Sequence, residues 1–137
     1  MFFNKKENKD ESNFIKIAAL LIHTAKIDEN YTEEEEEIIK KTLINLGVNK
    51  NNLENLITEA KKCEEDSNQI LDFTKEIKSL EDQDKIKIIK SLWKIIYSNQ
   101  DADIYETSLM RRLAGLLYID SKIMGDIKEQ IKKENFK

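Results

Sequence analysis

The residues best suited to chemistry in this chain are carboxylates and amides in two short polar stretches, at 28–35 and 99–106. The candidate oxygen ligands are Asp28, Asn30 and Glu35 in the first stretch and Asn99, Asp101, Asp103 and Glu106 in the second. Hard divalent cations take several oxygen ligands from carboxylates, carbonyls and water. If the fold brings the two stretches together, their carboxylates can converge on one cation.

Helix capping explains some of the same residues without any ligand. Thr32 with Glu35, and Asp103 with Glu106, have the spacing of capping boxes, and acidic groups in a first helical turn complement the helix dipole. An EF-hand is excluded, because the positions that must be glycine and glutamate, counted from Asp28, fall on a glutamate and an isoleucine. Both the cation site and capping alone therefore stay open.

Charge runs add a second kind of candidate surface. The five glutamates at 33–37 are either a solvated helix face or an acidic docking surface for a basic partner or for cations. The pairs at 40–41 (Lys-Lys) and 111–112 (Arg-Arg) favour internal ion pairs with an acidic turn, with capture of a partner's carboxylate or phosphate as the alternative.

Other chemistries have little support in the sequence. His23 and Cys63 are each the only residue of their type, and Trp93 is expected in the core. No phosphate-binding loop or nucleophile motif is present, so we expect no enzyme. Arginines occur only at 111–112 and the net charge is minus 4, so we expect no nucleic-acid partner. With no apolar run able to span a bilayer, we expect a cytoplasmic protein.

Apolar periodicity predicts an all-α fold. The chain has no proline and three glycines, and apolar residues recur at steps of three and four. Helices are predicted at about 13–26, 33–46, from a cap at Asn51 or Asn52, across 70–80, at about 82–98, from a cap at Asp103 and from Ser121. Gly115 is expected to permit close helix packing. Residues 1–12 are predicted to be a flexible tail, and 13–137 one domain.

An internal repeat organises these helices. Shifted by 71 positions, residues 15–64 align without a gap on 86–135, and the two polar stretches coincide. We expect a single compact bundle of about seven helices, with two three-helix units related by a pseudo-twofold axis and joined by a bridging helix. Pairing two such units buries apolar surface that one leaves exposed.

The stretch 95–119 resembles the tellurite-resistance protein TerB family. Its elements are an inter-helix turn, the acidic cap Asp103, Tyr105-Glu106 and the paired-arginine helix. The sequence departs from the family pattern at 98–100, where Ser-Asn-Gln replaces Ala-Asp-Gly, and at 28–29, where Asp-Glu replaces Asp-Gly.

The resemblance implies a non-catalytic helical domain of bacterial tellurite and stress-response systems, acting as a sensing or scaffolding module. By motif position, it implies that a divalent metal of calcium or magnesium type is bound by Asp28, Glu35, Asp103 and Glu106. The leading hypothesis is thus a domain that binds a cation or a protein partner through its acidic turns. The alternative is a structural interaction module whose acidic residues only cap helices.

Overall fold

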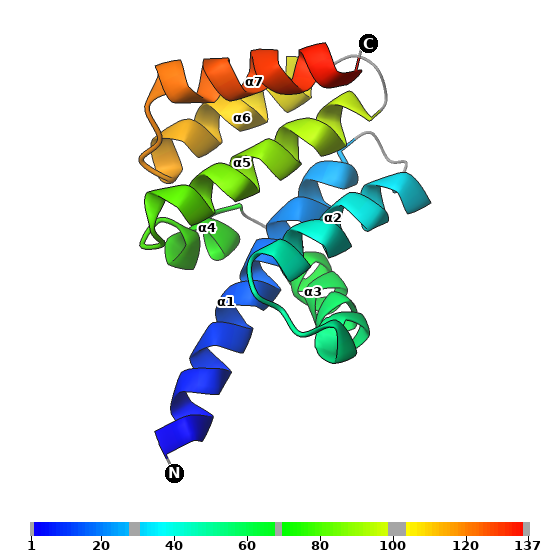
Figure 1. The fold of residues 1–137 in the computed structure, drawn as a ribbon, viewed down its shortest axis with the longest axis vertical. Helices are drawn as coiled ribbons and strands as arrows, with labels where there is room; N and C mark the ends of the chain where they lie inside the picture. Colours follow the sequence, from blue (N-terminus) through cyan, green and yellow to red (C-terminus); the bar gives the residue numbers. More distant parts are fainter. Residues whose placement is uncertain (1, 28–30, 68–69, 99–103, 136–137) are drawn as a thin grey trace.

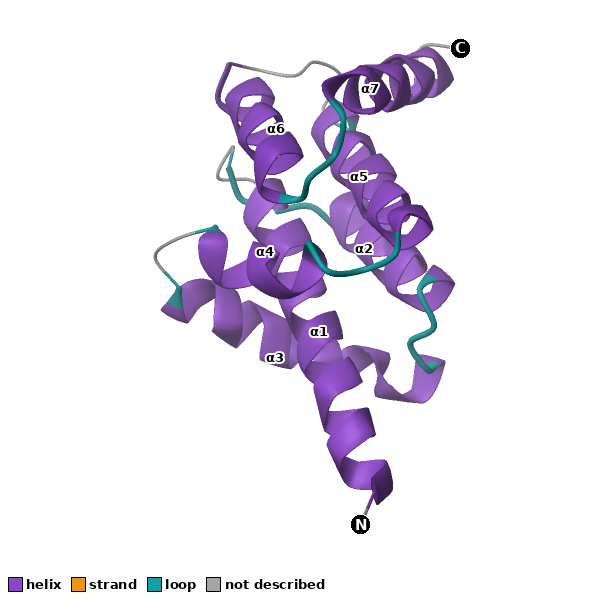
Figure 2. Ribbon diagram, turned by 90° about the vertical axis from the view of Figure 1, so that its left-hand side faces the viewer, coloured by secondary structure: helices purple, strands orange, loops and turns teal. Residues whose placement is uncertain are grey.

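The computed structural model describes residues 2–27, 31–67, 70–98 and 104–135, with side chains at 12–27, 31–67, 70–98 and 105–134. These residues form seven α-helices, one 3₁₀ turn and no strand, which confirms the all-α prediction (Figures 1 and 2). The elements are α1 (Phe2–Ala25), α2 (Glu33–Asn45), η1 (Lys50–Asn52), α3 (Leu53–Asp66), α4 (Leu71–Ile77), α5 (Asp82–Tyr97), α6 (Ile104–Leu116) and α7 (Ser121–Asn135).

Helix α1 begins earlier than the sequence pattern predicts. It starts at Phe2, within the segment 1–12 for which a flexible tail is predicted. Lysine and glutamate are good helix formers and no proline interrupts them, so a helix can continue where apolar periodicity has ended. The first turns of α1 project away from the other helices in both views (Figures 1 and 2).

The core is built on α1 and α5. Helix α1 contacts α2, α3, α4 and α5, and α5 also contacts α2 and α7. Six consecutive residues of α1, at 17–22, are buried, and α5 buries Ile88, Ile89, Leu92, Ile95 and Ile96. A helix buried around most of its circumference must pack on several sides. Helix α5 therefore lies at the centre of the fold with α1.

Helices α2 and α6 repeat one another in local structure. Helix α2 covers residues 33–45 and α6 covers 104–116, so both bounds differ by 71. Gly47 and Tyr118, at matching places after the two helices, both have positive φ, 112° and 57°. The following N–H groups donate to matching carbonyls, from Val48 to Leu43 (3.0 Å) and from Ile119 to Ala114 (2.9 Å). The 71-residue offset thus holds for the backbone of this helix and its terminal turn.

The start of α3 corrects one predicted cap. The side chain of Asn49 accepts a hydrogen bond from the Asn51 N–H (3.0 Å) and opens η1, which continues into α3. Asn52 holds the N-cap position of α3 but makes no capping hydrogen bond through its side chain. The asparagine that caps through its side chain is therefore Asn49, at the start of η1. It lies three residues before Asn52, the N-cap position of α3.

Candidate functional site

The first turn of α2 is a complete capping box. Thr32 has extended backbone angles, and its side-chain oxygen accepts a hydrogen bond from the Glu35 N–H at 3.1 Å. In return, Oε1 of Glu35 accepts from the Thr32 backbone N–H at 2.8 Å and from the Thr32 hydroxyl at 3.0 Å. Two backbone donors at the helix start are satisfied in this way. The box predicted at 32–35 is confirmed.

Glu35 and Glu106 are buried carboxylates at equivalent places. Each is the third residue of its helix, and their side chains are 1% and 5% exposed. A buried carboxylate loses hydration and needs interaction partners. Both of these residues have at least one. Other glutamates of the acidic run, Glu33, Glu34 and Glu37, are exposed. Burial therefore separates Glu35 from most of its charged neighbours.

The two buried acids belong to helices that run in the same general direction (Figure 1). Both helices run towards the left in Figure 1, where α2 starts at the right edge and α6 starts near the top, behind α7. Asp28 and Asp103, the other two predicted ligands, lie outside the described residues, as do the amides Asn30 and Asn99 and the carboxylate Asp101. Of the predicted site, the structure thus describes Glu35 and Glu106, one on each of the two helix starts.

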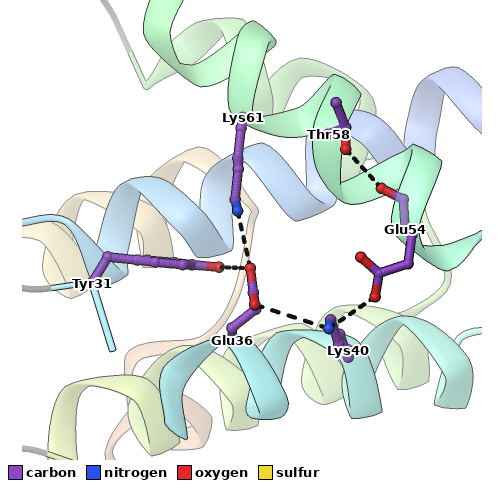
Figure 3. A network of polar contacts seen from close by, with 6 residues as sticks. All are labelled: Tyr31, Glu36, Lys40, Glu54, Thr58 and Lys61. Carbon is purple, nitrogen blue, oxygen red and sulfur yellow. Dashed lines mark hydrogen bonds and ion pairs between the residues drawn. The ribbon is translucent and has the colours of Figure 1, made fainter. Parts of the chain in front are cut away.

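A network of polar contacts, which we call the Glu36 cluster, lies beside this helix start (Figure 3). It consists of Tyr31, Glu36, Lys40, Glu54 and Lys61. Oε1 of Glu36 lies 3.1 Å from Lys61 Nζ and accepts a hydrogen bond from the Tyr31 hydroxyl at 3.3 Å. Lys40 Nζ lies 3.9 Å from Oε2 of Glu36 and 3.0 Å from Oε1 of Glu54. The cluster ties α2 and the residue before its cap to α3.

The electrostatics of the cluster favour an ionised Glu36 and a neutral Tyr31. Burial and the neighbouring Glu36 carboxylate raise the pKa of Tyr31 well above its usual range. Partial burial of Glu36 raises its pKa, but the hydrogen bond and charge of Lys61, with the charge of Lys40, lower that pKa further, and the net shift is downward. The hydrogen bond to Glu54 raises the pKa of Lys40. At neutral pH, Glu36 and Lys40 are therefore ionised and Tyr31 is neutral.

The basic pairs do not share one role. Lys40 forms ion pairs as expected, although its partners are Glu36, one helical turn earlier, and Glu54 of α3. Arg111, at the equivalent position, instead lines a pocket between α5, α6 and α7. Lys40 and Arg111 are both the eighth residue of their helices, but the neighbouring elements give the two side chains different surroundings.

His23 has an ionic neighbour, and Trp93 is buried. Nδ1 of His23 lies 3.5 Å from Oε1 of Glu64, whose other oxygen lies 2.7 Å from Lys26 Nζ. Trp93 is 2% exposed, as expected of a core residue. Among the residues that the structure describes, no three His, Cys, Asp or Glu side chains are grouped so as to hold a metal ion. Asp28 and Asp103 lie outside those residues.

The sequence did not predict the Glu36 cluster. Tyr31 and Glu36 are close in the chain, but Lys61 and Glu54 come from α3, and only the packing of α3 beside α2 brings them near. The one signal available was the unusual density of glutamate at 33–37, which needs cations nearby to limit repulsion.

In the part of the chain described, no helix has the length and apolar content needed to cross a membrane.

These features define an all-helical domain in which the third residue of two equivalent helices is a buried glutamate. The family model of tellurite resistance protein TerB matches residues 14–129, and the chain belongs to that family. Comparison with curated proteins and with solved structures gives no significant match.

Proposed function

We propose that this chain is a non-catalytic TerB domain that binds a divalent cation of calcium or magnesium type through its two acidic helix starts. The proposed ligands are Asp28, Glu35, Asp103 and Glu106. The observation that supports the proposal is the burial of Glu35 and Glu106, each at the third position of one of two helices whose bounds differ by 71 residues. We propose a cytoplasmic setting in a tellurite or stress response, which the family membership supports.

Capping and cation binding are compatible at Glu35. The capping box engages Oε1, whereas an ionised carboxylate has about four acceptor sites over its two oxygens. A cation close to two buried carboxylates offsets the hydration that they lose on burial. We also propose that each half of the chain is a three-helix unit, with α4 as the bridge. The packing of α3 on α1 and of α7 on α5 supports this.

The second candidate function is a structural module that binds a protein partner and uses its acids only as helix caps. The complete capping box at Thr32 and Glu35 favours it, because that box already accounts for a glutamate at this position. In this case the protein partner binds an apolar or basic surface of the domain.

Titration of the metal-free full chain with Ca²⁺, Mg²⁺, Mn²⁺ and Zn²⁺ separates the two functions. We expect binding heat in calorimetry and a higher melting temperature with Ca²⁺ or Mg²⁺. Glu35→Gln and Glu106→Gln should each weaken binding about tenfold, which corresponds to about 1.4 kcal/mol. Glutamine at the third position still closes a capping box, so these variants remove charge and keep the cap.

Glu34→Gln is the matched control, since Glu34 is exposed in the same helical turn as Glu35. Its affinity for the cation should equal that of the unaltered chain within about twofold. Absence of both heat and a melting shift at millimolar metal would exclude the cation site and leave the structural module. Equal affinities for all three variants would show that the ligands are other residues.

A further inference from the structure

An open pocket lies between α5, α6 and α7, away from the Glu36 cluster. Its volume is about 510 Å³, which is within the range of about 300–1,000 Å³ typical of small-molecule sites. Trp93 contributes from α5, Met110 and Arg111 from α6, and Met124 and Lys128 from α7. An apolar wall with two cations thus surrounds a space large enough for a small organic molecule.

Two of the three glycines in the chain line this pocket. Gly115 lies inside α6 and Gly125 inside α7, where glycine weakens a helix relative to alanine. A Cβ at either position would meet no atom within 4 Å, and neither residue has a positive φ. Backbone conformation and close helix packing therefore do not require glycine here, and the expected packing role of Gly115 is wrong. The absence of these two side chains keeps the pocket open.

Trp93 lines the pocket and carries a buried hydrogen-bond donor without a described partner. Its side chain is 2% exposed, and its indole Nε1 has no hydrogen-bond partner among the described residues. A buried N–H without a partner is unfavourable, so an acceptor that reaches it stabilises the site. Lys128 Nζ lies 5.6 Å from the centre of the indole ring, which places a positive charge beside this donor.

The charges of the pocket indicate an anionic ligand. Arg111 and Lys128 both line it, and across the described part of the chain neither has a carboxylate within ion-pair distance. Arginine pairs with a carboxylate through two parallel hydrogen bonds, and lysine adds a point charge. An acidic group can pair with these cations, while the methionine and isoleucine side chains accept an apolar body.

We propose that this pocket binds a small organic acid, a carboxylate attached to an alkyl chain or ring. Arg111 and Lys128 bind the carboxylate, and the space beside Gly115, Gly125 and the Trp93 indole holds the apolar part. The proposal is independent of the acidic helix starts. It therefore stands or falls separately from cation binding.

Trp93 is the only tryptophan in the chain, so its fluorescence reports directly on the pocket. The full chain is titrated with octanoate, which does not absorb where tryptophan is excited, and with octanamide as its neutral counterpart. We expect a saturable change in Trp93 emission with octanoate and at least about tenfold weaker binding of octanamide, since charged hydrogen bonds are the stronger ones.

Three substitutions locate the binding. Arg111→Gln and Lys128→Gln should each weaken octanoate binding about tenfold. Arg112→Gln, the adjacent exposed arginine that does not line the pocket, should leave it unchanged. Gly125→Leu should fill the apolar space and abolish the emission change, with helical circular dichroism confirming that the variant is folded.

Any of three results would overturn the proposal. These are no saturable response to octanoate, equal binding of octanamide, or equal losses for Arg111→Gln and Arg112→Gln. The arginine variants carry the decision even if Gly125→Leu does not fold, because both arginines are exposed and their replacement leaves the core intact.

Discussion

At the scale of single residues, Glu36 shows how position within an acidic run decides the role of a carboxylate. Its neighbours Glu33 and Glu34 are exposed, and Glu35 turns inward to close the capping box. Glu36 faces α3, where it forms an ion pair with Lys61. It also accepts a hydrogen bond from the hydroxyl of Tyr31, which lies before the cap of α2. Five identical side chains in a row therefore divide into solvated, capping and cross-linking groups according to the helical face on which each lies.

Glu36→Gln should destabilise the fold in a pH-dependent way. The pKa of Glu36 is lowered in the folded state, so its ionised form contributes stability above the unfolded-state pKa of about 4.5. That contribution disappears as the pH falls below this value through the folded pKa. We expect the variant to be about 1 kcal/mol less stable at pH 7, as for a partly buried charged hydrogen bond.

Urea unfolding of both proteins between pH 7 and pH 3 measures this difference. The stability difference between unaltered chain and variant should shrink below pH 4.5. Glu37→Gln is the control, since Glu37 is exposed on the same helix. A difference for Glu36→Gln that stays constant over the whole range would show that its ion pairs do not contribute to stability.

At the scale of elements, the turns after α2 and α6 have one backbone design and different residues. Gly47 adopts its positive φ of 112° without a side chain to clash, whereas Tyr118 adopts 57° with one. Near Tyr118, Lys85 donates to the Leu117 carbonyl at 3.0 Å, and its Nζ lies 6.0 Å from the Tyr118 ring centre. A buried lysine thus satisfies a carbonyl at the end of α6 and contacts the strained residue.

Alanine in place of glycine should have opposite effects at two positions. Gly47→Ala forces a side chain into a positive φ and should destabilise the fold by about 1–2 kcal/mol. Gly125→Ala adds a methyl group in open space inside α7 and should stabilise it by about 1 kcal/mol. Thermal and urea unfolding of the two variants measures the sign of each stability change. A loss of stability in both would contradict the statement that helix packing does not require glycine at position 125.

At the scale of the whole molecule, stability depends on the contacts that α1 and α5 make with the other helices. The first buried residue along the described side chains of α1 is Ile17, and the family match begins at residue 14. The earlier turns of α1 project from the other helices (Figure 1). Helical structure at 2–12 and membership of the domain are therefore separate properties.

Removal of residues 2–11 should leave the unfolding free energy within about 0.5 kcal/mol, as for a surface change. Circular dichroism should lose only the helical signal of those residues. Ile17→Ala is the contrast, because Ile17 is 2% exposed and its truncation should cost about 2–5 kcal/mol. A comparable loss on removing residues 2–11 would place the domain boundary at the N-terminus.

Local patterns in the sequence determined the elements of this protein. Apolar spacing located the helices, and Thr32 with Glu35 predicted the cap of α2. These features depend on residues within a few positions of one another, so one sequence is enough to identify them. The predicted start of α1 was wrong, because the first turns of this helix depend on helix propensity and show no apolar periodicity.

Tertiary structure alone decided what each side chain meets. Glu36 finds Lys61 of α3, Arg111 and Lys128 meet at one pocket, and the Trp93 N–H is left without a described partner. The carboxylates at 28–35 and 99–106 could be proposed as a site from their types, but burial of Glu35 and Glu106 became known only from the packed helices. Residue spacing determines the face on which a group lies, whereas the packing of separate helices determines what that face contacts.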